Sequence, residues 1–100
     1  MNEYDIRVGS IVLSTQGRDK GNYFLVVETS KGYVSLVDGG MRKLNAPKRK
    51  NVKHVSDSGA VAEVIAKKLL SQQKVFDSEV KSALRQFNQQ AGESQCQKTM

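Results

Sequence analysis

The first half of the chain alternates apolar and polar positions with the period of β-strands. Between Ile6 and Val55, short runs of β-branched and aromatic residues are each bounded by Gly, Asp, Asn or Pro, which is the pattern of a small all-β unit. The runs SIVLS, NYFLVVE and YVSLV are separated by GRDKG and SKG, and they predict three strands joined by hairpins. Two further runs, MRKL and NVKHV, predict the fourth and fifth strands.

The run NYFLVVE is apolar on both faces of its predicted strand. Tyr23, Leu25 and Val27 point to one face. Phe24 and Val26 point to the other. A strand of this kind favours a small barrel over a half-solvated sheet, because a curled sheet buries more than one face of a bent strand. The sequence therefore predicts a small five-stranded barrel.

Beyond Ser56 the period of the apolar positions changes from 2 toward 3.6. The first helical pattern has Asp57 or Ser58 available as its N-cap, and its apolar positions are Val61, Val64, Ile65 and Leu69. The second has Asp77 as its cap and Glu79 in its first turn, where the helix dipole favours an anion; its apolar stripe is Val80, Ala83, Leu84 and Phe87. The short link SQQK between the two patterns predicts a helical hairpin.

The sequence after Gln89 is polar, aperiodic and poor in large apolar groups. It lacks the apolar surface needed to offset the entropy of ordering, so we expect residues 91–100 to form a flexible tail. The expected organisation is a barrel in residues 1–56, a helical hairpin in residues 57–90 packed on or beside the barrel, and the tail. The expected fold class is mostly β with C-terminal α.

The charge of the chain is unevenly distributed. Its 100 residues fit one domain, and its formal net charge is +6. Residues 1–56 hold ten Lys or Arg against five Asp or Glu, whereas residues 57–100 hold six against five. The surplus of cations in the first half points to a polyanion, either nucleic acid or an anionic membrane.

Several classes of protein are disfavoured by what the sequence lacks. Its one cysteine, Cys96, excludes an internal disulfide framework, and no Cys/His grouping predicts a metal site. The motifs GxGxxG, GxxxxGK[ST], HExxH and GxSxG do not occur, so we expect no enzyme and no cofactor. No apolar run approaches the ~20 residues that cross a bilayer, and MNEYDIRVG lacks the apolar core of a signal peptide. We therefore expect a soluble cytoplasmic protein without a membrane partner.

Two interpretations of the GRDKG loop remain open. As a plain turn, Gly17 and Gly21 supply positive φ, Asp19 caps backbone amides, and the cations keep the loop solvated. As a ligand-binding loop, it presents Arg18, Lys20 and free backbone amides to phosphate oxygens, with glycine allowing close approach.

A basic run extends from Met41 to His54 and contains no acid. Its six cations are Arg42, Lys43, Lys48, Arg49, Lys50 and Lys53. A lysine-rich edge that discourages strand pairing requires fewer cations than this. If the run and GRDKG lie at the same end of a barrel, they form one cationic surface for which nucleic acid is the expected ligand. Arginines there could bind phosphate with two parallel hydrogen bonds or stack on unpaired bases.

The aromatic residues mostly lie inside periodic apolar segments, so core packing is their expected role. Tyr23 follows the GRDKG loop directly and is the aromatic best placed to stack on an exposed base, although packing is favoured for it too. His54 is likewise expected to be packed or hydrogen-bonded rather than to contact a ligand.

The stretch VGSIVLSTQGRDKGNYFLVVE, Val8 to Glu28, resembles the KOW motif, and Gly21 is similar to the hallmark glycine of that motif. In that family a strand, a glycine-bounded basic loop and a second strand form part of an SH3-like barrel. The motif is found in large-subunit ribosomal proteins, where the loop lies on ribosomal RNA, and in transcription-elongation factors. The continuation from Leu36 to Ser56 is similar to the second half of the barrel in small bacterial KOW-domain RNA-binding proteins.

The resemblance implies a five-stranded SH3-like barrel that binds RNA through Arg18, Lys20 and the neighbouring Asn22, and by analogy through the later basic run. The expected function is that of an RNA-binding protein associated with ribosomal RNA of the large subunit, without catalysis. The alternative is a KOW-type protein-interaction module of the translation or transcription machinery, and nonspecific DNA binding is a third hypothesis. The two C-terminal helices either cap the barrel or dock a protein partner.

Overall fold

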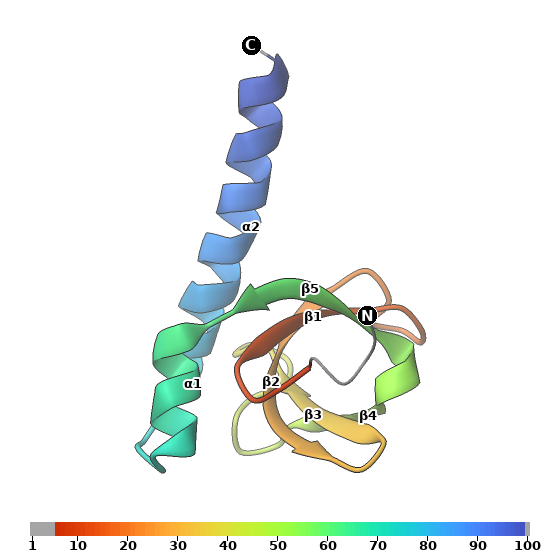
Figure 1. Ribbon diagram of the computed structural model, residues 1–100, viewed down its shortest axis with the longest axis vertical. Helices are drawn as coiled ribbons and strands as arrows, with labels where there is room; N and C mark the ends of the chain where they lie inside the picture. Colours follow the sequence, from red (N-terminus) through yellow and green to blue (C-terminus); the bar gives the residue numbers. More distant parts are fainter. Residues whose placement is uncertain (1–5, 100) are drawn as a thin grey trace.

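The computed structural model describes the backbone of residues 6–99 and the side chains of residues 6–88 (Figure 1). The strands are β1 (Ser10–Ser14), β2 (Tyr23–Ser30), β3 (Tyr33–Val37), β4 (Lys48–Asn51) and β5 (Val55–Val61). A 3-10 turn, η2 (Val52–His54), separates β4 from β5. The helices are α1 (Glu63–Leu70) and α2 (Asp77–Thr99). The expected class, mostly β with C-terminal α, is confirmed.

The five strands form one antiparallel sheet in the order β4-β3-β2-β1-β5. The sheet is strongly curled but not closed, since its edge strands β4 and β5 are not paired with each other (Figure 1). The register shifts between Ile11 and Val12 and between Val26 and Glu28, and irregularities of this kind bend a strand and increase its twist.

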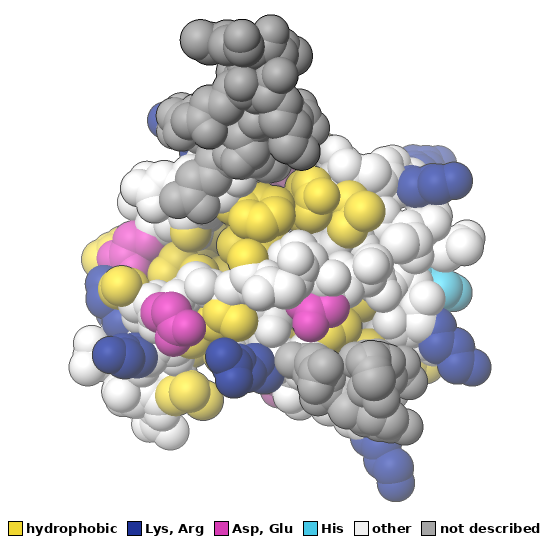
Figure 2. All heavy atoms as spheres, turned by 45° about the horizontal axis from the view of Figure 1, so that its top comes forward, with side chains coloured by type: hydrophobic (Ala, Val, Ile, Leu, Met, Phe, Trp, Pro, Cys, Tyr) yellow, Lys and Arg dark blue, Asp and Glu magenta, His cyan; other side chains and the backbone are white. Residues whose placement is uncertain are grey.

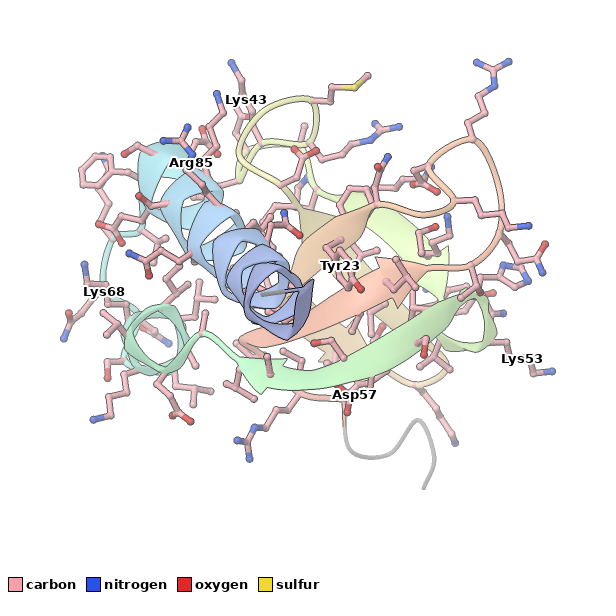
Figure 3. The ribbon with its side chains drawn as sticks, turned by 90° about the horizontal axis from the view of Figure 1, so that it is seen from above. Tyr23, Lys43, Lys53, Asp57, Lys68 and Arg85 are labelled. Carbon is pink, nitrogen blue, oxygen red and sulfur yellow. The ribbon has the colours of Figure 1, made fainter. Side chains whose placement is uncertain are left out.

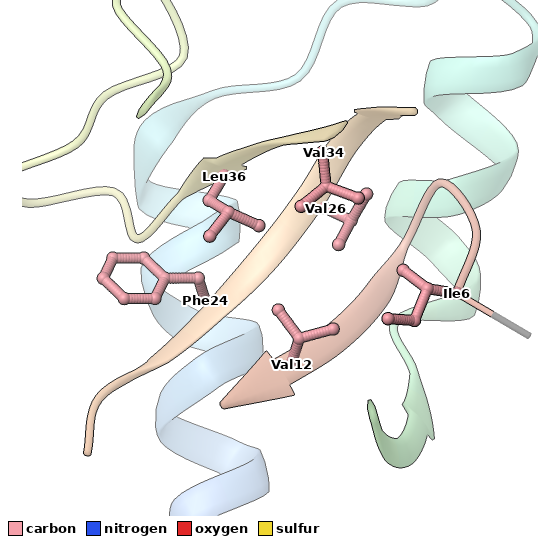
Figure 4. Packing of buried hydrophobic residues seen from close by; sticks show 6 residues of the cluster. All are labelled: Ile6, Val12, Phe24, Val26, Val34 and Leu36. Carbon is pink, nitrogen blue, oxygen red and sulfur yellow. The ribbon is translucent and has the colours of Figure 1, made fainter. Parts of the chain in front are cut away.

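One face of the curled sheet encloses the first hydrophobic cluster. Its buried members are Ile6, Val12, Phe24, Val26, Val34 and Leu36. Figure 4 shows these side chains pointing toward one another between the strands. All but Ile6, which precedes β1, come from alternate positions of β1, β2 and β3, as the period of 2 requires for one face of a sheet.

The opposite face of β1 and β2 is covered by the helices. Ile11, Leu25 and Val37 on the strands pack in a second cluster with residues of α1 and α2, namely Ile65, Val80 and Leu84. The two apolar faces of NYFLVVE therefore pack against different parts of the molecule. One face lines the inside of the curled sheet, and the other binds the helices.

The expected strand MRKL is wrong. Residues 39–47 form turns, because their backbone N–H groups have partners other than a strand ladder. The Asp38 carboxylate accepts hydrogen bonds from the N–H groups of Gly40 (2.9 Å) and Arg42 (2.8 Å), and Asp77 accepts one from Leu44 (2.7 Å). The fourth strand is instead β4, in the lysine-rich KRKN segment.

The run NVKHV does not form a single strand. The Asn51 side chain accepts a hydrogen bond from the Lys53 N–H and caps η2, after which β5 pairs with β1 from Val55 through Val61. The expected boundary at residue 56 thus falls within β5. The N-cap of α1 is Ala62 rather than Asp57 or Ser58. The Ser58 hydroxyl instead donates to the Ile11 carbonyl, and the Asp57 carboxylate accepts from the Gly59 N–H.

The second helix begins at Asp77 as expected, and Val80 and Leu84 of its stripe are buried. It continues to Thr99, so the backbone of residues 91–99 is helical where the sequence predicted a flexible tail. Each added residue gains a hydrogen bond once a helix is nucleated, and Gln, Ala, Glu and Lys favour helix. In the part of the chain that the structure describes, no helix is long and apolar enough to cross a membrane.

Candidate nucleic-acid interface

The loop between β1 and β2 is a tight hairpin connection formed by residues 15–22. The Gly21 N–H donates to the Ser14 carbonyl (2.9 Å), and the Ser14 N–H donates to the Asn22 carbonyl (2.9 Å). Gly17 and Gly21 have φ values of 91° and 92°, in the left-handed region that other residues avoid. The conformation predicted for these two glycines is confirmed.

Asp19 is the centre of a hydrogen-bonded cluster that joins this loop to β4. Its Oδ1 accepts from the Lys50 ammonium (2.6 Å) and the Ser14 hydroxyl (2.7 Å), and its Oδ2 accepts from the Lys48 ammonium (2.9 Å). Sequence analysis predicted that Asp19 caps backbone amides. The structure instead gives its carboxylate two lysines and one hydroxyl, because β4 lies beside the loop.

Strand register explains why both lysines reach the loop. Lys48 and Lys50 pair with Leu36 and Val34, which line the inside of the curled sheet. Cross-strand partners point to the same face, so the two ammonium groups extend toward the open side, where Asp19 lies. Ion pairs thus join two segments that are 29 and 31 residues apart, where the sheet has no hydrogen-bonded closure.

Lys50 is buried within this cluster, and its ammonium group is hydrogen-bonded there. Only 7% of it is exposed, and its ammonium also donates to the Gln16 carbonyl (2.8 Å). Lys48 is half-buried. Both were predicted as RNA contacts, and their ammonium groups instead have partners within the chain.

The pKa of Asp19 is displaced by the same contacts. Burial opposes ionisation and acts to raise the pKa, but hydrogen bonds from Lys50, Lys48 and Ser14 outweigh it. The pKa of the Asp19 carboxyl therefore lies well below its ordinary value, and the cluster retains its ion pairs at neutral pH.

The cluster leaves a separate set of cations facing solvent. Arg18 and Lys20 flank Asp19, and both are exposed. Arg49 lies between the two buried or half-buried lysines of β4 and points to the opposite face, where its guanidinium lies 4.3 Å from the centre of the Tyr33 ring. Within residues 6–88, no ion pair involves Arg18, Lys20 or Arg49. Asn22 is exposed beside them.

The remaining predicted cations lie elsewhere. Lys53 is exposed in η2, whereas Arg42 and Lys43 are exposed in the loop of residues 38–47. In Figure 3, Lys43 and Lys53 lie on opposite sides of the molecule. The structure therefore brings GRDKG and the KRK segment together, as predicted, but divides the basic run among several surfaces.

The aromatic residues also divide by position. Tyr23 packs edge-to-face on Phe87 of α2, with ring centres 4.9 Å apart, so it belongs to the contact between sheet and helix. Tyr33, which sequence analysis placed in the core, is 38% exposed. It borders a recess of about 550 Å³ together with Lys31, Asn51 and Lys53. The polar Ser35, two positions further along the same strand face, was the signal in the sequence that could have identified its outward position.

An apolar groove of about 600 Å³ lies where β5, α1 and α2 meet. Ala60, Ile65, Ala83 and Phe87 line it, together with Val64, which is 67% exposed. Figure 2 shows apolar side chains gathered on the face between β5 and α2. Lys68 and Glu79, which form an ion pair, also line the groove, so it offers apolar surface beside charged groups.

The described residues form no metal-binding group and leave no buried polar side-chain atom without a partner. They contain no group of three or more His, Cys, Asp or Glu placed to hold a metal ion. Each buried side-chain nitrogen or oxygen described has a hydrogen-bond partner, so no unsatisfied polar atom marks a ligand.

No protein-family model and no curated protein matches the chain. Its function is therefore inferred from the curled sheet and its exposed cations.

Proposed function

We propose that this chain is an RNA-binding protein that attaches to ribosomal RNA of the large subunit through the β1–β2 loop and the outward face of β4. The observation that carries this proposal is the Asp19 cluster, which fixes the loop on β4 while Arg18 and Lys20 stay exposed. The resemblance of Val8 to Glu28 to the KOW motif supports RNA as the ligand and the ribosome as its source.

The cluster favours binding because it fixes the loop in advance. A loop that becomes ordered only on binding loses conformational entropy at that step, which weakens affinity. Here the hairpin bonds of Gly21 and Ser14 and the ion pairs of Asp19 hold the loop in the free protein. Arg18 and Lys20 are then presented to phosphate groups from a fixed backbone.

The finer assignment of the fold is part of the proposal. The strand order, the curvature of the sheet and the 3-10 turn between β4 and β5 support an SH3-like barrel of the KOW type. In this assignment the β1–β2 loop is the KOW loop, and Gly21 is the motif glycine with a left-handed conformation.

The exposed aromatic residue favours unpaired RNA as the target. Bases in single strands and loops can stack on aromatic rings and on arginine guanidinium planes, whereas regular duplex hides its bases in a groove too narrow for side chains. Tyr33 and Arg49 provide one surface of each kind on the outer face of β3 and β4. Lys31 and Lys53 border the adjacent recess and would bind the flanking phosphates.

Binding is tested by fluorescence polarisation with a labelled 20-nucleotide oligouridine and increasing salt. For four phosphate contacts on a single strand, affinity should fall about 50-fold between 50 and 200 mM salt. Arg18→Glu with Lys20→Glu should weaken binding by about tenfold or more beyond the control. The matched control is Lys67→Glu with Lys74→Glu, which makes the same change in net charge at exposed positions of α1 and the α1–α2 link. Equal affinities of the two variants would overturn the proposal.

The ribosomal assignment has its own test. The protein is crosslinked to RNA in cells, and the bound RNA is sequenced. Reads concentrated at one locus of large-subunit ribosomal RNA support the assignment. Reads spread over messenger RNA would overturn it, even if oligouridine binding in solution is retained.

A protein-interaction module is the second candidate, and the apolar groove between β5 and α2 favours it. The groove would receive the apolar face of an amphipathic helix from a partner in the translation or transcription machinery. Val64→Arg places a charge at its exposed rim and should abolish that association while leaving oligouridine binding unchanged. Undiminished recovery of the partner with this variant would contradict the second candidate.

A further inference from the structure

The loop of residues 38–47 is attached to the first turns of α2. The Leu44 N–H donates to the Asp77 carboxylate (2.7 Å), across 33 positions of sequence. Gly39, at φ 80°, lies very close to the helix. A Cβ atom there would stand 2.5 Å from the Asp77 carbonyl oxygen and 3.0 Å from the Lys81 backbone nitrogen. The cations carried by this loop are therefore neighbours of α2 rather than of the Asp19 cluster.

The two elements that meet at this junction carry four exposed cations. Arg42 and Lys43 come from the loop, while Lys81 and Arg85 lie one turn apart on α2. Residues four positions apart share a face of a helix. Figure 3 shows Lys43 and Arg85 on the same side of the molecule, one from each element. Residues 57–100 are nearly neutral as a whole, but beside this loop α2 carries two cations, Lys81 and Arg85, against one carboxylate, Asp77.

The nearby carboxylates are engaged with the backbone. Asp38 accepts from the N–H groups of Gly40 and Arg42, and Asp77 accepts from that of Leu44. Within residues 6–88, no ion pair involves any of the four cations. Backbone hydrogen bonds leave the two carboxylates charged, but the four cations outnumber them, and a bound polyanion would neutralise the remaining positive charge.

We propose that Arg42, Lys43, Lys81 and Arg85 form a second phosphate-binding surface, so that α2 is part of the RNA interface. This inference rests on the proposed RNA-binding function and extends it to the helical region. Lys48 follows Lys43 by five positions along the chain, so these two backbone positions lie within about 18 Å of each other. One RNA strand could therefore bind both the β1–β2 loop surface and this second surface.

The test uses the full chain and the same labelled 20-nucleotide oligouridine. Lys81→Glu with Arg85→Glu should lower affinity by about tenfold or more and should reduce the slope of log affinity against log salt by about 1.4, which corresponds to two lost contacts on a single strand. Lys81→Arg with Arg85→Lys keeps both charges and should retain the affinity. Unchanged helical circular dichroism would establish that the charge-reversed variant is folded.

The control separates this inference from the proposed function. If Lys81→Glu with Arg85→Glu binds oligouridine like Lys67→Glu with Lys74→Glu, the second surface is refuted. If Arg18→Glu with Lys20→Glu still weakens binding in that case, the RNA-binding function stands without it. Loss of binding to phosphatidylserine vesicles, with oligouridine affinity at the control value, would assign these cations to a membrane and would also overturn the inference.

Discussion

Replacing Asp19 with asparagine removes the charge that holds Lys48 and Lys50 against the β1–β2 loop while keeping nearly the same side-chain volume. Lys50 would then remain 7% exposed, with the Gln16 carbonyl as the described partner of its ammonium group. An ammonium group in this position is poorly hydrated and has lost its counter-charge. We therefore expect Asp19→Asn to destabilise the fold.

The magnitude follows from the burial of the pair. Removing one partner of a fully buried ion pair costs about 3–5 kcal/mol, whereas an exposed pair contributes about 0.2–1 kcal/mol. The Asp19 and Lys50 side chains are 14% and 7% exposed, at the open side of the sheet, where the lysine can shift toward solvent. An intermediate loss of about 2 kcal/mol is expected.

Urea denaturation followed by far-ultraviolet circular dichroism measures this loss, because the chain has no tryptophan to report by fluorescence. With an m-value of about 2 kcal/mol per molar urea, the midpoint should fall by about 1 M. Arg18→Gln is the control, since the exposed Arg18 flanks the same carboxylate and its loss should change stability by less than about 0.5 kcal/mol.

A second substitution distinguishes the cost of leaving Lys50 without a counter-charge from a general weakening of the loop. Lys50→Met in the Asp19→Asn background removes the uncompensated ammonium and should recover half or more of the lost stability, because apolar residues can replace a buried ion pair at little cost. If Asp19→Asn has the midpoint of the control, or if Lys50→Met adds a further loss, the role assigned to the Asp19 cluster is wrong.

Three further outcomes are expected. The stability difference between wild type and Asp19→Asn should be complete at pH 7 and should shrink as pH falls below about 4, because a carboxyl whose folded pKa is lowered loses its contribution when it is protonated; a constant difference in acid urea titrations would contradict this. Gly39→Ala should destabilise more than Gly21→Ala in the same titration: both glycines have positive φ, but a Cβ clashes with α2 at Gly39 alone, and equal losses would refute the close contact. Tyr33→Ala should weaken oligouridine binding by about 1–3 kcal/mol at nearly unchanged stability, and undiminished affinity would remove Tyr33 from the interface.

The hairpin strands β1, β2 and β3 could be predicted from sequence because each forms locally, from an apolar run bounded by turn residues. MRKL and the start of α1 could not, because distant groups decide them. Leu44 donates to Asp77 from the other half of the chain, and β5 continues to Val61 because it pairs with β1. Periodicity records which face of a segment is apolar and contains no information about these partners.

The site shows the same division. Positive φ at Gly17 and Gly21 and the proximity of GRDKG to the KRK segment were expected from sequence. Which cations face the inside of the sheet and which face solvent could not be expected from sequence. Lys48, Arg49 and Lys50 alternate between the two faces of β4 according to a register that only the folded sheet defines. Lys81 and Arg85 were overlooked because the loop that joins them to Lys43 depends on a tertiary contact.

The helices that cover the outward face of β1 and β2 set the order in which the fold can be completed during synthesis. Twenty-six positions separate the end of β5, Val61, from Phe87, which packs on Tyr23. At about 5–20 residues per second, the ribosome makes this segment in roughly 1–5 s. Throughout that interval the Leu25 and Ile11 side chains of the emerging sheet are exposed to solvent. A nascent chain that stalls before α2 therefore carries an exposed apolar surface that favours aggregation.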